Sequence, residues 1–496
     1  MNYQDFISNE KSLLIAPAGY GKTHAIAECL KYSPDDERQL ILTHTHAGIA
    51  SIKEKIKKFD LPSSKYQVET ITGFAQKYTL AFYCLSDIPP QEDSQNYYPF
   101  IIKKTTELLS KESIKRIISI SFQGLFVDEY QDCTVNQHKM IMALSEILPT
   151  HIFGDPMQGI FSFNEMLVNL DVDLKTFKEV EPLDIPWRWY NGCNNKTLGT
   201  ALKEIRTILA TTNKTINLSK YNSAIKYVKV NESDIYNNKS YYRDCLNKLL
   251  LNQKKLPYLN SLLIIVPEYY ENNIPKGDIS ARSKLKSQID YSNQLTLLEA
   301  IDNKDFYTIS KKIDELVEGI GRKRKKIKTL NEEVFCKLFN KGCVDDYILD
   351  DRLKSKREPN IEKKNKLELR INIFLDCPSI IAFLNIILLM KHEMRFKTKR
   401  LDLLNSIIKS MNIAICEDKS VYEGMVSYKN IIRRVGRKIH GKCIGTTLLT
   451  KGLEFDTVAI LNAHRFDNYK HFYVAITRAC KHLIIFTENE TLSFRD

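Results

Sequence analysis

The residues best suited to chemistry lie in a short glycine-containing segment near the N-terminus, Ala16-Pro17-Ala18-Gly19-Tyr20-Gly21-Lys22-Thr23. It follows an apolar run that predicts a strand and precedes a run that predicts a helix. Glycines let the backbone approach phosphate oxygens, and the amides at a helix N-terminus point at them. Lys22 can neutralise the outer phosphates, and the Thr23 hydroxyl can ligate Mg²⁺. We therefore predict that ATP and Mg²⁺ bind here, although Ala16 replaces the first glycine of the usual pattern.

A second group is the pair of acids in FVDEYQD, residues 126–132. Asp128 and Glu129 follow an apolar run, and ligands of open α/β sheets bind at the carboxyl ends of strands. Asp128 can hold Mg²⁺, and Glu129 can accept the proton of the water that attacks the γ-phosphate. A solvated strand end is the alternative interpretation of this pair.

Two sets of elements must position these groups. Short apolar runs that read as buried parallel strands alternate with helical stretches in the first third of the chain, and a similar set returns later. The runs are 12–19, 39–44, 124–130, 150–156, 225–230, 261–267, 442–449, 456–463 and 481–487. This alternation predicts an α/β fold with two parallel sheets. Between 296 and 440 the strand signal fades, and helical stretches lie among basic runs at 322–328 and 429–442.

Composition limits the partners and the compartment. The 496 residues carry 73 Lys+Arg against 60 Asp+Glu, a formal charge of +13, which favours an acidic partner such as nucleic acid. The 11 cysteines are scattered and form no C-x-x-C pair, so we expect reduced thiols rather than a zinc site or disulfides. We find no membrane-spanning run and no signal-peptide pattern, and expect a cytoplasmic protein without a membrane partner.

These motifs, taken in order, resemble those of the UvrD/Rep-like branch of superfamily 1 DNA helicases. The likeness covers most of the chain. Its strings are APAGYGKT (16–23), LTHTHAGIA (42–50), TITGF (70–74), VDEYQD (127–132), GDPMQGIF (154–161), PWRW (186–189), TTLLTKGLEF (446–455) and FYVAITRA (472–479). The resemblance implies two RecA-like P-loop domains with reduced, mainly helical insertions. The expected bounds are 1–200 with a small insertion near 75–122, then 201–295 plus 441–496, with 296–440 as the basic insertion.

The resemblance also implies roles in the nucleotide site. Catalytic roles fall to Lys22, Glu129, Gln158 as a γ-phosphate sensor, and Arg188 and Arg478 as arginine fingers. The nucleotide contacts it implies are Gln4 on the adenine edge, Trp187 stacked on adenine, Glu454 on the ribose, and Ala18, Gly19, Tyr20, Gly21, Lys22 and Thr23 around the phosphates. Surface ion pairs are the alternative for the two arginines, and core packing is the favoured interpretation of Trp189.

The DNA side departs from the family pattern. The implied contacts are His44, Thr45, Thr72, Phe161, Phe163 and Thr446. However, His44 replaces the usual aromatic and Ala47 the usual lysine, while Asn164 and Leu448 replace an arginine and a histidine. For His44, a polar residue at a strand end is an equally good interpretation.

From this set we expect a DNA-dependent ATPase that translocates on single-stranded DNA, a 3′-to-5′ helicase of DNA repair or anti-phage defence. The compact build resembles the helicase-like subunit of Gabija-type systems, whose partner is an OLD-family nuclease with a TOPRIM domain. The altered DNA side leaves a second hypothesis open. In it, the chain is an ATP-dependent, DNA-sensing regulatory subunit that activates a partner nuclease and unwinds little itself.

Overall fold

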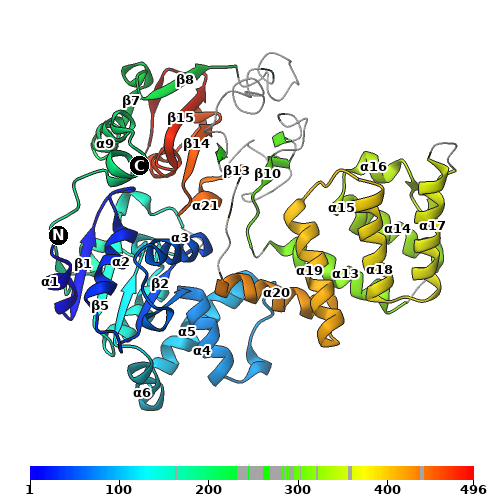
Figure 1. Ribbon diagram of the computed structural model, residues 1–496, viewed down its shortest axis with the longest axis horizontal. Coiled ribbons are helices and arrows are strands. Elements are labelled where there is room, and N and C mark those ends of the chain that lie inside the picture. The colour runs from blue at the N-terminus through cyan, green and yellow to red at the C-terminus, as the bar shows by residue number, and fades with distance from the viewer. Residues whose placement is uncertain are drawn as a thin grey trace. The chain divides into compact units, whose positions relative to one another are not determined.

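A computed structural model gives the arrangement of the chain (Figure 1). It describes residues 1–161, 165–231, 261–267, 295–301, 303–319, 322–355, 360–435 and 441–495, together with a few single residues between them. The chain forms two compact units, one of residues 1–296 with 433–496 and one of residues 297–432. The first unit holds two six-stranded sheets, and the second is built mainly of helices. The predicted α/β fold with two parallel sheets is therefore confirmed.

The first sheet has the strand order β3-β2-β4-β5-β1-β6, and all of its pairings are parallel. Its strands are β1 (Lys11–Ile15), β2 (Gln39–Thr43), β3 (Tyr66–Thr70), β4 (Gly124–Val127), β5 (Thr150–Gly154) and β6 (Lys178–Glu179). Consecutive side chains of a strand point to opposite faces, and here both faces are covered. Leu13 and Leu125 belong to one core, whereas Leu14 and Phe126 belong to the other. Two-sided burial explains why the four inner strands, β2, β4, β5 and β1, are largely apolar runs.

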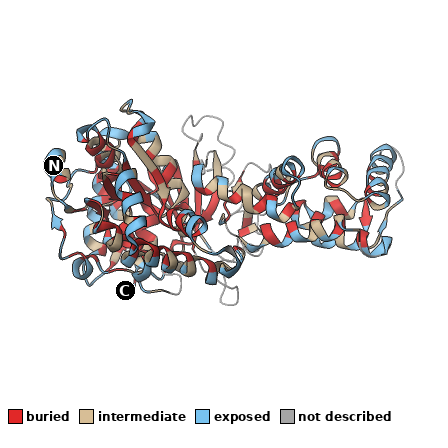
Figure 2. Cartoon of the chain, turned by 90° about the horizontal axis from the view of Figure 1, so that it is seen from below, coloured by how far each residue is buried: buried red, intermediate tan, exposed pale blue. Residues whose placement is uncertain are grey.

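Helices supply the other half of each core. Those on the Leu14 side are α1 (Tyr3–Ser8), α2 (Lys22–Tyr32) and α3 (His46–Lys57). Those on the Leu13 side are α4 (Ile71–Phe82), α5 (Ser94–Leu109), α6 (Glu112–Ser121) and α7 (Val135–Ser145). Buried residues concentrate on the strands and on the inner faces of the helices, and exposed residues cover the outer faces (Figure 2). The phosphate loop and the acidic pair follow strands β1 and β4 at the carboxyl edge of this sheet.

The second sheet has the order β10-β13-β9-β14-β15-β8, and the strands from β13 to β8 pair in parallel. Its strands are β8 (Ile225–Lys229), β9 (Leu262–Val266), β10 (Thr296–Leu297), β13 (Lys442–Thr446), β14 (Phe455–Ile460) and β15 (Ala479–Thr487). β7 (Thr215–Asn217) and β16 (Thr491–Ser493) form an antiparallel pair beside it. The helices of this half are α9 (Lys196–Leu209), α21 (Thr447–Thr450) and α22 (Tyr469–Ile476). The predicted strand at 442–449 ends at Thr446, and α21 begins at the next residue.

The second unit is helical, as expected for this stretch. Its main elements are α13 (Lys304–Val317), α14 (Lys323–Thr329), α16 (Lys341–Asp345), α17 (Ile361–Asp376), α18 (Ile380–Leu388), α19 (Leu401–Glu417) and most of α20 (Val421–Val435), with the hairpin of β11 (Ile348–Leu349) and β12 (Arg352–Leu353). The apolar stretch 371–394 is broken at Cys377 because Pro378 disfavours helical backbone at the residue before it. Ser379 then caps α18 by accepting a hydrogen bond from the amide of Ala382.

No helix among the described residues is both long and apolar enough to cross a bilayer.

Candidate functional site

The loop between β1 and α2 has the backbone of a phosphate-binding turn. Gly19 and Gly21 have φ angles of +76° and +105°, a region that favours glycine. A Cβ on Gly19 would also lie 2.6 Å from a ring carbon of Trp189, so this glycine is required for space as well. Lys22 begins α2, and its Nζ donates to the carbonyl oxygens of Ala16 (2.7 Å) and Pro17 (3.2 Å). The ammonium group is therefore held directly under the loop that would cradle phosphate.

The acidic pair lies at the carboxyl end of β4, as predicted. Asp128 is buried, and its Oδ1 accepts the amide of Glu129 at 3.0 Å. Burial, and then the charge of Glu129, raise the pKa of Asp128 to about 7. Burial also opposes ionisation of Glu129, but Lys451 and Lys22 outweigh it and lower its pKa to about 2. Glu129 is therefore a carboxylate at neutral pH, the form that a general base requires.

Lys451, which sequence reasoning did not single out, comes from the second sheet domain and enters this acidic site. Only 2% of its surface is exposed. Its Nζ forms an ion pair with Asp132, donates to the carbonyl oxygen of Gln158, and lies 3.8 Å from Oε2 of Glu129. Because these contacts join residues about three hundred positions apart, no local pattern in the sequence could reveal them.

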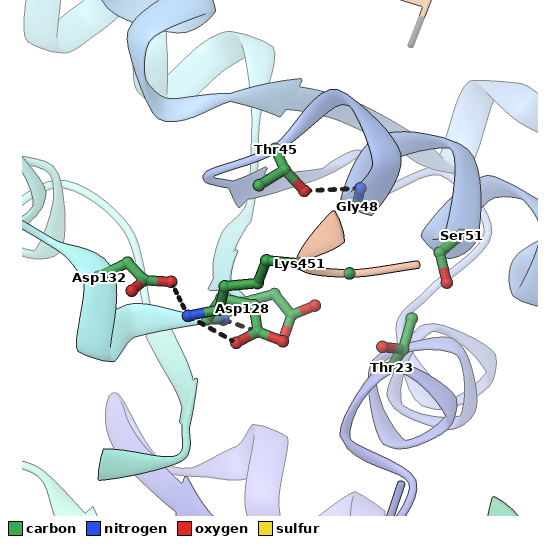
Figure 3. Close-up of a pocket in the computed structure, with 9 residues that line it drawn as sticks. Thr23, Thr45, Gly48, Ser51, Asp128, Asp132 and Lys451 are labelled. Carbon is green, nitrogen blue, oxygen red and sulfur yellow. Dashed lines mark hydrogen bonds and ion pairs between the residues drawn. The ribbon is translucent and has the colours of Figure 1, made fainter. Parts of the chain in front are cut away.

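These groups line a small pocket that is partly open to solvent (Figure 3). It is lined by Thr23, Thr45, Gly48, Ser51, Asp128, Glu129, Asp132, Lys451 and Gly452. Mg²⁺ takes oxygen ligands and usually keeps several waters, with only one or two carboxylates from the protein. The hydroxyl of Thr23 and the carboxylate of Asp128 face the same pocket and fit this requirement. Bound there, the ion would screen the charge of the phosphates.

Gln158 and Arg478 meet across the two sheets. Gln158 lies in a short turn after β5, and Arg478 follows α22; both are buried. Nη2 of Arg478 donates to Oε1 of Gln158 at 2.9 Å, and its Nε donates to the carbonyl of Val474 at 3.0 Å. Burial, and then Arg188, lower the pKa of Arg478 to about 10, so the guanidinium keeps its charge at neutral pH.

Arg188 also bridges the two halves. It donates to the carbonyl of Thr477, and its Nη2 lies 2.8 Å from Oε1 of Glu454. Glu454, predicted to bind a ribose, is thus paired with an arginine instead of standing free, and its ribose role stays a prediction. The alternative of a surface ion pair holds only in part for Arg188, since its partner is exposed but its own side chain is 13% exposed.

The predicted adenine contacts differ in what surrounds them. Trp187 is 43% exposed, and its ring centroid lies 5.8 Å from that of His24 on α2. An exposed indole beside the phosphate loop suits a stacking role. Trp189 is 1% exposed and donates from its indole nitrogen to the carbonyl of Ala479 at 2.8 Å, which confirms core packing. Gln4 is exposed on α1.

The predicted DNA contacts gather partly around Lys451. The ammonium group of Lys451 lies 5.3 Å from the ring centroid of Phe161, and Thr45 caps α3 by accepting the amide of Gly48 at 2.9 Å. His44 lies 3.3 Å from the sulfur of Cys133, and burial and Lys451 lower its pKa to about 3. A neutral His44 cannot form an ion pair with phosphate.

The remaining members of this set lie elsewhere. Thr72, at the start of α4, is 3.4 Å from the hydroxyl of Thr70, and Thr446 is buried at the end of β13. Phe163 lies outside the described residues. DNA contact by all six residues stays a prediction.

One protein-family model matches the part of the chain that forms the first sheet. A family model described as an AAA domain matches residues 3–164, which include the phosphate loop, the acidic pair and Gln158. The match spans about a third of the chain, the part that carries the phosphate-binding turn.

Solved structures similar to the chain include two Pif1 helicases. The Bacteroides enzyme, in complex with ADP-AlF3 and ssDNA, has 11% identity and a TM-score of 0.39, with 97% of this chain and 90% of that chain covered. The Candida albicans enzyme has 10% identity and a TM-score of 0.37, with 99% and 95% covered. None of the curated proteins matches the chain significantly.

Proposed function

We propose that this protein is a DNA-dependent ATPase of the superfamily 1 helicase type, which translocates on single-stranded DNA and unwinds duplex in the 3′-to-5′ direction. ATP with Mg²⁺ would bind between the two sheets of the first unit. Lys22 would neutralise the phosphates, Thr23 and Asp128 would hold the metal, and Glu129 would take the proton of the attacking water. This proposal includes membership of the UvrD-like branch and a cytoplasmic location. It also includes the domain bounds 1–200, 201–295 plus 441–496, and 296–440.

One observation carries it: cationic side chains from the second sheet domain reach the phosphate-handling groups of the first. Arg478 bonds to Gln158, and Lys451 pairs with Asp132. Phosphoryl transfer spreads negative charge that fixed cations stabilise. Because these cations belong to the other half, hydrolysis depends on how the two halves meet, which is the requirement of a motor driven by domain closure. A small-molecule kinase would not need this second set of groups.

The direct test is the ATPase rate of the purified chain with and without single-stranded DNA. We expect a substantial increase with DNA, and a rate that DNA leaves unchanged would count heavily against a translocase. Strand displacement from a duplex with a 3′ overhang and from one with a 5′ overhang would then determine polarity, which the proposal sets as 3′-to-5′.

The second candidate is a DNA-sensing regulatory subunit of an anti-phage system that uses ATP to activate a partner nuclease of the OLD/TOPRIM type. It is favoured by His44, which replaces the base-stacking aromatic of the family pattern and whose Nε2 lies 3.3 Å from the sulfur of Cys133. Strand displacement with and without the nuclease separates the two candidates. Robust unwinding by the isolated chain would exclude the regulatory one, whereas DNA-stimulated hydrolysis without unwinding would favour it.

A further inference from the structure

Arg206, near the C-terminal end of α9, belongs to none of the motifs but contacts both halves of the site. Its Nη2 and Nη1 donate to Oδ1 and Oδ2 of Asp155 at 2.8 and 3.0 Å. Its Nη1 also donates to the hydroxyl of Tyr473 at 2.6 Å. Asp155 follows β5 of the first sheet, whereas Tyr473 lies on α22 beside the second sheet. A single guanidinium group therefore fastens the two halves to each other.

Asp155 passes this constraint to the hydrolytic groups. Its side chain is fully buried, and its Oδ2 also accepts Nε2 of Gln158 at 2.9 Å. Its amide donates to Oε1 of Gln131 at 2.8 Å, and Nε2 of Gln131 donates to Glu129. The position of one acidic residue thus sets the orientation of both amide side chains. One of them is the proposed γ-phosphate sensor, and the other contacts the proposed base.

Tyr473 passes the same constraint to the phosphate loop. Its hydroxyl accepts the amide of Ala18 at 3.3 Å as well as the hydrogen of Arg206. Arg478 follows the same helix and bonds to Gln158. The contacts therefore close a ring: Arg206, Asp155, Gln158, Arg478, the backbone of α22, Tyr473 and again Arg206.

A merely structural ion pair would show the same bidentate geometry and would stabilise the fold alone. Two features favour a further role. The guanidinium makes its third hydrogen bond to the hydroxyl that holds a phosphate-loop amide, and the carboxylate it holds orients Gln158. Planar, forked donors fix direction as well as charge, which a lysine cannot do.

We propose that Arg206 is a positioning residue for ATP hydrolysis. It acts through Asp155 and Tyr473 to fix the positions of the Gln158 side chain and the Ala18 amide relative to each other. The inference rests on the proposed ATPase function. It states that Arg206 affects the chemical step more than the binding of ATP, because Arg206 touches neither the loop lysine nor the metal ligands.

The test compares steady-state ATP hydrolysis of wild type, Arg206→Lys, Tyr473→Phe and the control Tyr221→Phe. Lysine keeps the charge, so Asp155 is not left unpaired, but it loses the fork. We expect kcat of Arg206→Lys to fall roughly 10- to 100-fold, with KM for ATP within about threefold of wild type. Tyr473→Phe keeps the ion pair and should lie between this variant and wild type. Tyr221 is also buried, and its hydroxyl has no partner among the described residues, so its variant should match wild type.

Melting temperature of each variant is measured alongside. If both variants of the ring hydrolyse ATP at the wild-type kcat, the inference is wrong and the ATPase function stands. Should Arg206→Lys fail to fold, Tyr473→Phe decides by the same criterion. A kcat of Tyr473→Phe equal to that of Tyr221→Phe would then overturn the inference. If wild type itself hydrolyses no ATP with or without DNA, the proposed function fails and the inference fails with it.

Discussion

The nucleotide side and the predicted DNA side of the first unit contrast in how their groups are fixed. Around the phosphate loop, polar groups take partners from other segments: Lys22 bonds to loop carbonyls, and Arg478 bonds to Gln158. On the DNA side, His44 is held neutral and Thr446 is buried. Chemistry that needs placement within a fraction of an ångström requires such mutual support. Binding to the DNA backbone tolerates substitution of individual residues, because many different basic groups can neutralise the phosphate charge.

The largest effect is expected for Lys22→Ala, which tests whether the nucleotide side is the essential one. This substitution removes the positive charge held under the loop, and hydrolysis should fall at least roughly 100-fold. ATP turnover with saturating single-stranded DNA is the measurement. Lys31→Ala, on the exposed face of the same helix, is the control. Retention of most of the activity would show that this loop does not bind the phosphates.

Arg478→Ala tests the contribution of the second half. An arginine that stabilises transferred phosphoryl charge contributes on the order of 1,000-fold or more to kcat, so the rate should collapse while nucleotide affinity remains. Turnover and equilibrium binding of a fluorescent ATP analogue are measured in parallel, with the exposed Arg116→Ala as control. Loss of affinity equal to the loss of rate would assign Arg478 to binding.

Glu129→Gln separates binding from chemistry on the first half. The amide keeps the shape but cannot take a proton, and turnover should fall roughly 100-fold or more with ATP still bound. Because the pKa of Glu129 is lowered to about 2, the wild-type rate should not decline through protonation of this group anywhere near neutral pH. Glu112→Gln, exposed on α6, is the matched control. Substantial turnover by Glu129→Gln would remove this residue from the role of base.

Charge reversal in the basic run 322–328 tests whether this run, rather than the altered motifs, binds DNA. Within it, Arg322, Lys323, Arg324 and Lys325 are exposed, whereas Lys326 is buried. Reversing Lys323 and Arg324 to glutamate should weaken binding of single-stranded DNA. It should also flatten the dependence of log affinity on log salt, by roughly 0.7 for each phosphate that the variant no longer neutralises. Reversal of Lys363 and Arg370, exposed on α17 of the same unit, is the control. Equal effects of both pairs would indicate a general charge effect.

The smallest effect on DNA is expected for His44→Gln. Because His44 is neutral near pH 7, the salt dependence of DNA binding should not change, and a shallower slope would contradict its lowered pKa. Its effect should appear in stability instead. As pH falls below the ordinary value of 6.5, the unfolded chain binds a proton that the folded chain refuses until about 3, so wild-type stability declines in that window. Chemical denaturation at several pH values should show a weaker decline for His44→Gln.

Sequence patterns revealed what depends on neighbours along the chain. The apolar runs marked strands such as β2 and β4 because burial on both faces leaves a local signature. The loop from Ala16 to Thr23 could be recognised in the sequence by its glycines and its lysine. By contrast, the edge strand β3, with the half-buried sequence YQVET, gave no clear run.

The parts of the site that join distant segments could not be found in this way. Lys451 pairs with Asp132 across 319 positions, and Arg206 reaches Tyr473 across 267. Such pairs are set by how two sheets meet, and a lone lysine or arginine on a helix looks like any solvated charge. The motif resemblance singled out both Arg188 and Glu454, but it gave no sign that they bond to each other.

The chain has only two tryptophans, and they flank Arg188 on either side. One indole is 43% exposed and the other 1%. Their intrinsic emission therefore comes from a solvated, quencher-accessible ring and a shielded one, each next to the same arginine in the chain. If the exposed indole, that of Trp187, stacks on adenine as predicted, binding of ATP should change its emission, and nucleotide binding would be measurable without an added label.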